Sequence, residues 1–259
     1  MFKKINAAKK KYSFWKHIAL ESTRSRLLGK NGAVALKDVL TFLSSCGITH
    51  WVDAGTLLGI VRDGCFIEGD TDIDIGILFN TDGKEFIAAL EEAGFTIRYS
   101  YHYSNGDLAL LRIEKHFVGI DIECFRRDES VYYYDAPREY VGLEPPPTPF
   151  VHSALRYVYE ATCLDNLEKR FFQNICFPAP SNLDLYFSTY YKNWKQKIGK
   201  RNYLDGYFGV HVDLYQHHND KASYNPDDVL FFHTYSSSTI TVTLFEVILS
   251  VVKAKVGKI

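Results

Sequence analysis

This 259-residue chain lacks three features, and their absence limits the classes of protein to which it can belong before any motif is considered. It has no run of about 18 apolar residues, the length that a membrane-spanning helix needs, because Glu246 and Ser250 interrupt the longest stretch. Neither sign of charge dominates, with 30 Lys and Arg against 31 Asp and Glu, which argues against a generic electrostatic partner of nucleic acid. The five cysteines form no CxxC pair, so we expect reduced thiols rather than a disulfide framework or a zinc site.

The N-terminus also lacks the apolar stretch of a secretory signal, although it carries six lysines in its first 17 residues. A helix with one basic face is predicted up to about Arg26. Such a helix either packs on the domain with its charges in water or makes a peripheral contact with anionic lipid. We therefore expect a cytoplasmic protein, lying at the inner face of the membrane if the basic helix binds lipid.

Helical and extended patterns alternate through the next part of the chain. Leu36, Val39, Leu40 and Leu43 have the i, i+3, i+4, i+7 spacing of an amphipathic helix, and Gly47 is placed to end it. Further patterns predict helices at 56–61 and 84–93, and strands at 48–53, 73–79, 95–103, 108–114 and 117–125. This alternation predicts an α/β (α+β) fold in which helices flank a mixed β-sheet.

The part of the chain after residue 145 is predicted to be mainly helical. Successive prolines in the segment 144–150 cannot continue a helix or a central strand, so that segment marks a loop or a lobe boundary. Helices are then expected at 153–159, 165–172 and 184–197. We divide the chain into a basic N-terminal helical segment (1–30), a core (31–145) and a mainly helical C-terminal part (146–259).

Four acidic residues at every second position form the most informative stretch, namely Glu68, Asp70, Asp72 and Asp74. If the segment is extended, all four side chains point to one side, where like charges roughly 7 Å apart repel one another. Such a side either stays wet, keeps some carboxyls protonated, or holds a cation. Hard divalent ions such as Mg²⁺ take oxygen ligands of this kind.

Two further features surround these acids in the sequence. Asp121 lies inside an otherwise apolar strand, where an unpaired charge is costly, so it neighbours either the same cation or a buried arginine such as Arg112. Upstream, Gly55 and Thr56 open a predicted helix whose first turn offers free N–H groups to a phosphate, and Arg62 follows as a bidentate donor.

This ordered set resembles the nucleotidyltransferase superfamily, whose pattern is a Gly-Ser/Thr turn, an Asp-x-Asp pair and a third carboxylate on a later strand. More narrowly, the segment GTLLGIVRDGCFIEGDTDIDIGI (55–77) resembles the signature of the LicD/fukutin family, and the likeness extends over roughly residues 48–195. The chain departs from that family at Ala54, where Gly is usual, at Glu68-Gly69, at Thr71 and at Tyr190-Tyr191. These departures leave the carboxylates intact.

The resemblance implies a nucleotidyltransferase-like core and a phosphotransferase that takes part in building cell-surface polysaccharide. Its members move a phospho-alcohol, such as phosphocholine or ribitol phosphate, from a nucleotide diphosphate-linked donor to a sugar hydroxyl. A CDP-linked alcohol is the favoured donor, and a glycan or lipid-linked glycan is the expected acceptor, held on the side of the C-terminal part.

Residue roles follow from the same resemblance. Asp72 and Asp74 are expected to hold Mg²⁺ or Mn²⁺, with Asp121 completing the metal site and orienting or deprotonating the acceptor hydroxyl. The donor diphosphate is expected to lie against Gly55, Thr56 and Arg62. Asp70 is expected to support the ligands or to add one.

Two other functions remain open on the sequence. A nucleotidyltransferase that moves a nucleoside monophosphate from a triphosphate to a small molecule would keep the same metal residues. A non-catalytic glycan-binding relative would keep the fold, but it has no reason to hold mutually repelling acids at a strand end. Metal binding separates this last function from the two enzymes.

Overall fold

A computed structural model describes most of the chain, namely residues 2–78, 82–137, 150–151, 153–191, 193–197, 210–213 and 230–234. Five helices lie in these ranges: α1 (Phe2–Ser45), α2 (Ala54–Asp63), α3 (Gly83–Glu92), α4 (Ala161–Leu164) and α5 (Leu183–Ser188). The strands of the first half are β1 (His50–Val52), β2 (Asp72–Leu78), β3 (Thr96–Tyr103), β4 (Leu108–Lys115), β5 (Val118–Asp128) and β6 (Val131–Pro137). Those of the second half are β7 (Phe150–Val151), β8 (Ser153–Glu160), β9 (Leu167–Phe172), β10 (Ile175–Pro180), β11 (Val210–Asp213) and β12 (Leu230–Thr234).

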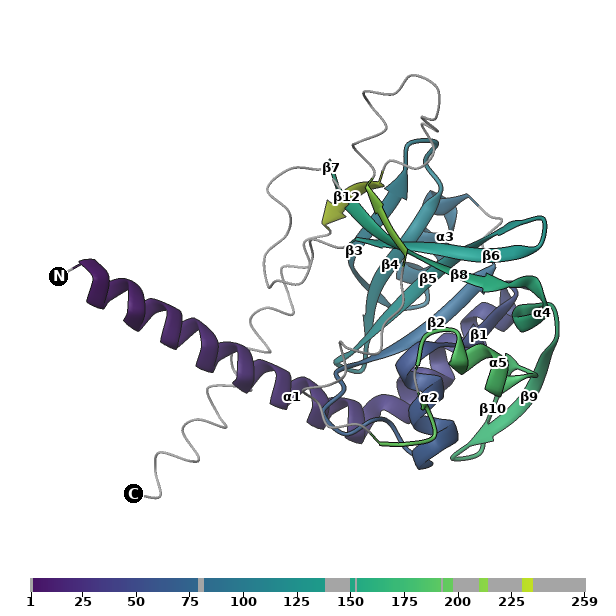
Figure 1. Cartoon of the computed structure of the whole chain (residues 1–259), viewed down its shortest axis with the longest axis horizontal. Coiled ribbons are helices and arrows are strands. Elements are labelled where there is room, and N and C mark those ends of the chain that lie inside the picture. Colours follow the sequence, from purple (N-terminus) through teal and green to yellow (C-terminus); the bar gives the residue numbers. More distant parts are fainter. Residues whose placement is uncertain are drawn as a thin grey trace.

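Most strands join one mixed sheet in which β5 is the central member (Figure 1). Along the sheet the order is β11-β8-β6-β5-β4-β3-β12-β7, and β2 branches from β5 and carries β1 at its other side. All of these pairs are antiparallel except β2 with β5, which run parallel. The predicted α+β class, with a mixed sheet flanked by helices, is therefore confirmed.

A two-residue turn connects β4 to β5. His116 and Phe117 both have positive φ, at 53° and 64°, as the tight turns that suit the twist of paired strands require. The turn fixes the register in which Arg112 of β4 lies opposite Asp121 of β5. The strands predicted at 108–114 and 117–125 are thus confirmed, within about three residues at each end, and they form a hairpin.

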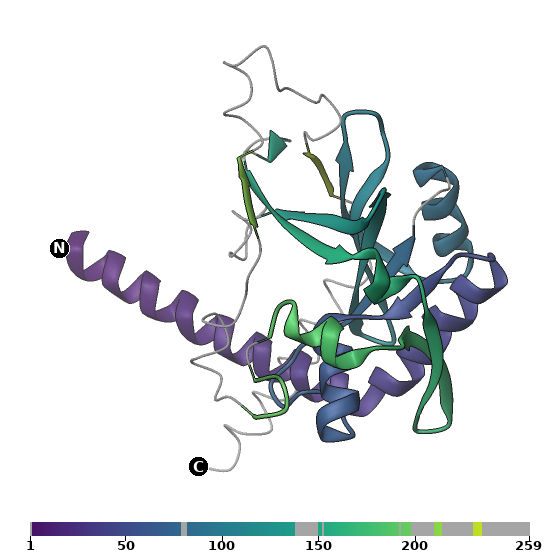
Figure 2. The ribbon, with the colours of Figure 1, turned by 45° about the vertical axis from the view of Figure 1, so that its right-hand side comes forward.

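The long helix α1 packs its C-terminal half against the sheet, while its N-terminal end projects away from it (Figures 1 and 2). Leu36, Val39 and Leu43 are fully buried in the same apolar cluster as Ile73 and Ile75 of β2. Burying each such side chain contributes on the order of 1.5–3 kcal/mol. The helix is continuous across residue 30, where the sequence suggested a boundary, and the division into three regions stays a prediction. The side chains that would form the predicted basic face, residues 2–18, lie outside the described part.

The expectation of a mainly helical C-terminal part is wrong for the described residues. The segment 153–159 forms strand β8, because Tyr157 and Tyr159 alternate with less buried neighbours and suit a pleated surface. The segment 165–172 ends in strand β9, which pairs with β10 through a turn at Gln173 and Asn174, both at positive φ.

The third expected helix, 184–197, is also corrected, because α5 ends at Ser188. Beyond it the amide of Tyr190 bonds the carbonyl of Phe187, three residues back, and Asn193 takes a positive φ of 51° that ends helical structure. The prolines of 144–149 and the end of the predicted strand at Phe79 lie outside the described residues.

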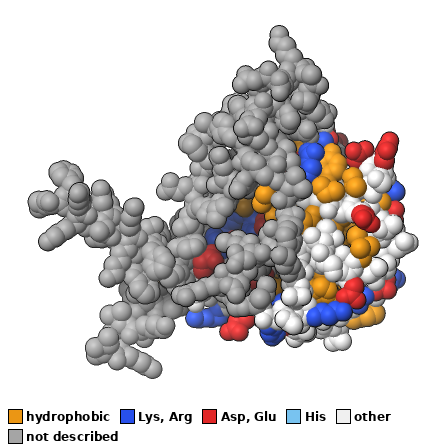
Figure 3. Space-filling view, in the orientation of Figure 1, with side chains coloured by type: hydrophobic (Ala, Val, Ile, Leu, Met, Phe, Trp, Pro, Cys, Tyr) orange, Lys and Arg blue, Asp and Glu red, His pale blue; other side chains and the backbone are white. Residues whose placement is uncertain are grey.

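No helix in the described ranges combines the length and the apolar character needed to cross a membrane. On the face seen in Figure 3, acidic and basic side chains are interspersed with apolar ones over the described surface.

Candidate functional site

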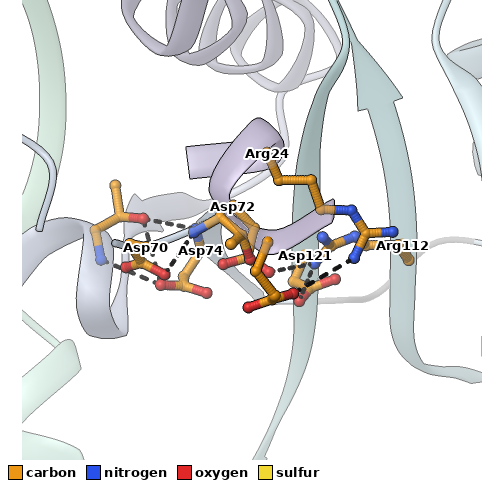
Figure 4. Close-up of polar contacts among 9 residues, drawn as sticks. Arg24, Asp70, Asp72, Asp74, Arg112 and Asp121 are labelled. Carbon is orange, nitrogen blue, oxygen red and sulfur yellow. Dashed lines mark hydrogen bonds and ion pairs between the residues drawn. The ribbon is translucent and has the colours of Figure 1, made fainter. Parts of the chain in front are cut away.

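The acidic residues of β2 and β5 share one face of the sheet. Asp74 lies directly opposite Asp121 in the parallel pair, and Asp72 lies opposite Gly119. Because side chains alternate along a strand, Asp72 and Asp74 point away from the buried Ile73 and Ile75. The structure thus brings together the three residues expected to be ligands, Asp72, Asp74 and Asp121 (Figure 4).

Asp70 joins this group from the turn that precedes β2, whereas Glu68 does not. Gly69 takes a positive φ of 85°, and the amide of Asp70 bonds the carbonyl of Ile67, so the chain turns before the strand begins. Glu68 is exposed on that turn. Of the four acids at every second position, only Asp72 and Asp74 therefore lie on an extended strand. Asp70 approaches them from the side (Figure 4).

The first turn of α2 faces the same carboxylates. The amide N of Thr56 donates to Oδ2 of Asp74 at 3.1 Å, and the Thr56 hydroxyl accepts from the Asp74 amide at 2.8 Å. A side chain at Gly55 would place its Cβ 3.2 Å from Oδ2 of Asp70 and 3.3 Å from Oδ2 of Asp74. The helix N-terminus and its glycine therefore cradle the two acids that lie farthest from Arg112.

Arg112 of β4 closes the other end of the group. Its Nη1 donates to Oδ2 of Asp121 at 2.6 Å and to Oδ2 of Asp72 at 2.7 Å. Of the two explanations open for a charged residue inside β5, the buried arginine partner is the one observed. Burial alone would lower the pKa of Arg112, but Asp121 and Asp72 outweigh it and hold the guanidinium charged.

Within the described part of the chain, no basic side chain bonds the acids at the α2 end, and their pKa values are raised. Burial, reinforced by the charge of Asp72, raises the pKa of Asp70 to about 7 and that of Asp74 well above its usual value. Burial also raises the pKa of Asp121, although Arg112 opposes the shift. The group is therefore short of positive charge, and most so around Asp70 and Asp74.

Two further buried acids, Asp53 and Glu123, lie next to this group. Asp53 caps α2 by accepting from the Ala54 amide at 2.7 Å, and Glu123 follows Asp121 on the same face of β5. Burial raises the pKa of Asp53 to about 6 and, together with the Asp53 charge, raises that of Glu123 well above its usual value. Sequence reasoning missed this pair, although Glu123 continues the alternation that marked Asp121.

Arg62 does not reach the carboxylates through any contact seen here. It lies in the last turn of α2, and its Nε and Nη2 donate to the two carboxylate oxygens of Asp63 at 3.0 and 2.9 Å. Lys197 lies 3.3 Å from the same acid. The role expected for Arg62 in holding a diphosphate stays a prediction.

Arg24 of α1 is the positive side chain that the sequence did not single out. Figure 4 shows it extending from the helix toward Asp121 and Arg112, and its charge opposes the rise in the pKa of Asp121. The side chain is 42% exposed, unlike Arg112 at 14%. Nothing in its sequence context marks it, because only the packing of α1 beside the strands brings it near.

The donor atoms of the site suit a hard divalent ion. They are carboxylate oxygens, the chemistry that Mg²⁺ and Mn²⁺ prefer, and Asp70 and Asp74 are bonded by backbone amides rather than by a basic side chain among the described residues. Within the described residues, however, no three acidic, His or Cys side chains already converge as a closed set of ligands. Two of these acids, Asp72 and Asp121, are instead paired with Arg112.

Comparisons with known proteins place this site in a family. Residues 47–182 match the model of the LicD/FKTN/FKRP nucleotidyltransferase domain. An uncharacterized protein of Rickettsia prowazekii is 30% identical over 135 residues, which cover 47% of this chain and 51% of that protein. A second uncharacterized protein, from Rickettsia typhi, is 27% identical over 97 residues, covering 34% of this chain and 31% of its own length.

A mammalian relative carries a named activity. Ribitol-5-phosphate transferase FKTN of Mus musculus is 29% identical over 102 residues, which are 39% of this chain and 21% of the mouse protein. The chain thus spans about half or less of the length of these curated relatives. The matched domain covers more than half of the chain and contains the α2 turn, Asp72, Asp74 and Asp121. This chain therefore belongs to the LicD/FKTN/FKRP family of nucleotidyltransferase domains.

Proposed function

We propose that this protein is a divalent-cation-dependent transferase that moves a phospho-alcohol from a nucleotide diphosphate-linked donor to a sugar hydroxyl of a glycan. The family and the named activity of the mouse relative support a ribitol-phosphate or similar group. The CDP-linked donor is the one that the sequence resemblance favours. The observation that carries the proposal is the meeting of Asp72 and Asp74 with Asp121 beside the first turn of α2.

Asp72 and Asp74 are the ligands that we assign to the cation, which is Mg²⁺ or Mn²⁺, and Asp70 lies where it can add an oxygen. When bound, such an ion neutralises charge on the phosphate oxygens during transfer. Gly55 leaves space for the carboxylates, and Thr56 fixes Asp74 by two hydrogen bonds. The work of the chain is mainly positioning, which suits phosphoryl-type transfer.

Asp121 is the residue that we assign to the acceptor. Arg112 holds its Oδ2, and the partnerless Oδ1 is the atom that takes the proton of the attacking hydroxyl. The hydroxyl oxygen forms a bond to the phosphorus that carries the alcohol, while the bond from that phosphorus to the oxygen of the nucleoside monophosphate breaks. The monophosphate then leaves with the bridging oxygen.

Arg24 is a better placed candidate than Arg62 for contacting the donor phosphates. It is half exposed beside Asp121, and its Nη1 makes a long ion pair of 3.9 Å with Glu21. Two donor atoms of Arg62, in contrast, are taken by Asp63 at 3.0 and 2.9 Å. The basic N-terminal part of α1 leads to Arg24, so a lipid-linked acceptor at the inner face of a membrane is the acceptor class that we favour.

The released product distinguishes this function from nucleotidyl transfer, which the nucleotidyltransferase name of the matched domain also favours. The protein is incubated with Mg²⁺, a glycan acceptor and either CDP-ribitol or CTP, and the nucleotide products are separated by anion-exchange chromatography. Release of CMP from CDP-ribitol, dependent on acceptor and Mg²⁺, supports the proposal. Release of pyrophosphate from CTP without any release of CMP would show nucleotidyl transfer instead.

A further inference from the structure

Arg112 bridges two of the carboxylates of the site. One of its nitrogens, Nη1, lies within hydrogen-bond distance of both Asp72 and Asp121. These two acids stand on neighbouring strands and face each other across a diagonal of the β2–β5 pair, since Asp121 is opposite Asp74 and Asp72 is opposite Gly119. A single positive group thus bridges two carboxylates from different strands.

The sheet is built to admit the guanidinium at this point. A side chain at Gly119 would place its Cβ 2.3 Å from Nη2 and 2.8 Å from Cζ of Arg112, so only glycine leaves the room that Arg112 fills. Gly119 lies between the two acids in the register, opposite Asp72 on β2 and two residues before Asp121 on β5. Tyr99, on the other side of β4, lies opposite Arg112.

The hydrogen bonds of Arg112 reach only one end of the acidic group among the residues that the structure describes. Asp72 and Asp121 bond it directly, whereas neither Asp70 nor Asp74 shows a bond to a cationic side chain among the described residues. Asp74 is instead bound by Thr56, and Asp70 by the Thr71 amide at 2.9 Å. The α2 end therefore lacks a cation, while the β4 end already has one.

We propose that Arg112 takes the place of a second cation between Asp72 and Asp121, so that the site accepts one divalent ion, at the Asp70–Asp72–Asp74 end. This inference rests on the proposed function for the presence of the first ion. It assigns Arg112 as a positioning residue that competes with the ion for Asp72 and holds Asp121 for the acceptor.

The number of ions bound per chain tests this directly. Mn²⁺ is titrated into the full chain, and bound ion is counted from the loss of the free Mn²⁺ signal in electron paramagnetic resonance. We compare wild type with Arg112→Gln, which removes the charge but keeps hydrogen-bond donors. The matched control is Arg98→Gln, which removes an arginine bound to Glu114 at 2.7 Å on the adjoining strands.

We expect Arg112→Gln to bind one Mn²⁺ more per chain than wild type, and Arg98→Gln to match wild type. An unchanged count in Arg112→Gln would overturn the inference. If that variant does not fold by circular dichroism, Gly119→Ala serves in its place, because the added methyl displaces the guanidinium and should give the same gain of one ion. An unchanged count in a folded Gly119→Ala would overturn the inference equally.

The count in wild type tests the proposed function separately. One ion in wild type agrees with both the proposed cation dependence and the assignment of Arg112. Two ions in wild type would overturn the assignment of Arg112 while leaving the cation dependence intact. No ion in wild type combined with one in Arg112→Gln would contradict the proposed cation dependence yet support the assignment of Arg112. No ion in either protein would overturn both.

Discussion

The guanidinium of Arg112 lies against the backbone of Gly119, at a spot where a Cβ would come within 2.3 Å of its Nη2 atom. This contact lets one arginine reach Asp72 and Asp121 together. Because the obstructing atoms are the end of a flexible side chain, we expect Gly119→Ala to move the arginine rather than the strand. At least one charged hydrogen bond is then lost.

The expected result of Gly119→Ala is a loss of about 1.5–3 kcal/mol in the free energy of unfolding, the contribution typical of a hydrogen bond to a charged group. Chemical denaturation followed by circular dichroism measures it. Gly29→Ala is the control: a Cβ added there would have no neighbouring atom within 4 Å, and because the residue is inside α1 the change should raise stability by up to about 1 kcal/mol. Equal stability of Gly119→Ala and wild type would show that the arginine does not depend on this glycine.

Gly55→Ala should weaken ion binding without disturbing the fold. Its methyl would lie 3.2 and 3.3 Å from the Oδ2 atoms of Asp70 and Asp74, so both carboxylates must give way by a few tenths of an ångström. Changes to groups that orient metal ligands commonly cost 10–100-fold in affinity, and we expect a loss of about tenfold for Mn²⁺. Titration calorimetry measures the change, and an affinity equal to wild type would argue against ion binding between these two acids.

Ala54→Gly should stabilise the protein. Ala54 has a φ of 39°, in the left-handed region that costs a residue with a Cβ roughly 1–2 kcal/mol. Glycine removes that cost but adds freedom to the unfolded chain, which leaves a gain of up to about 1 kcal/mol. A thermal melt in EDTA measures the change. A melting temperature of Ala54→Gly clearly below that of wild type would mean that the packing of the alanine methyl contributes more to stability than the positive φ costs.

Stability of the ion-free protein should fall as the pH rises. Burial raises the pKa of Asp53 to about 6 and that of Asp70 to about 7, against about 3.9 in an unfolded chain. The folded chain therefore binds more protons than the unfolded chain between about pH 4 and 7, and stability is lost across that window. A difference of one pKa unit is worth about 1.4 kcal/mol, so the expected loss is on the order of several kcal/mol. Each kcal/mol corresponds to roughly 2–4 °C in melting temperature for a chain of this size.

Melts in EDTA at pH 5 and pH 8 check this dependence. Asp70→Asn should reduce it to the part that Asp53 contributes, because the asparagine has no proton to lose. Asp128→Asn, at the exposed end of β5, should leave it unchanged. A wild-type melting temperature that is higher at pH 8 than at pH 5 would contradict the raised pKa values of Asp53 and Asp70.

Local patterns were enough to predict the parts of the site that lie on regular strands. The alternation of Asp72 and Asp74 with buried isoleucines predicted their common face, and Asp121 was expected to join them. Residues brought in by packing were beyond such reasoning. Arg24 is brought beside β5 by the packing of α1, although it precedes that strand by more than 90 residues in the sequence. Arg62 is turned toward Asp63, which follows it in the chain.

The C-terminal strands were mistaken for helices for a related reason. Short segments such as Leu167–Phe172 have no clear period of their own, and their extended form is stabilised by pairing with a partner strand, here β10. Ala54 shows the reverse case. The resemblance already marked this position as one where glycine is usual, and the structure supplies the cause in its positive φ.

The central claim is that Asp74 and its neighbours bind the donor through a divalent ion, and the most direct measurement is calorimetric titration of CDP-ribitol. The titration is run with Mg²⁺ and with EDTA, on wild type, Asp74→Asn and the control Asp128→Asn. Asp74→Asn should fold, since it relieves repulsion from Asp70 and Asp72. We predict Mg²⁺-dependent binding in wild type and Asp128→Asn that is lost in Asp74→Asn. Equal binding in EDTA, or undiminished binding in Asp74→Asn, would contradict the account.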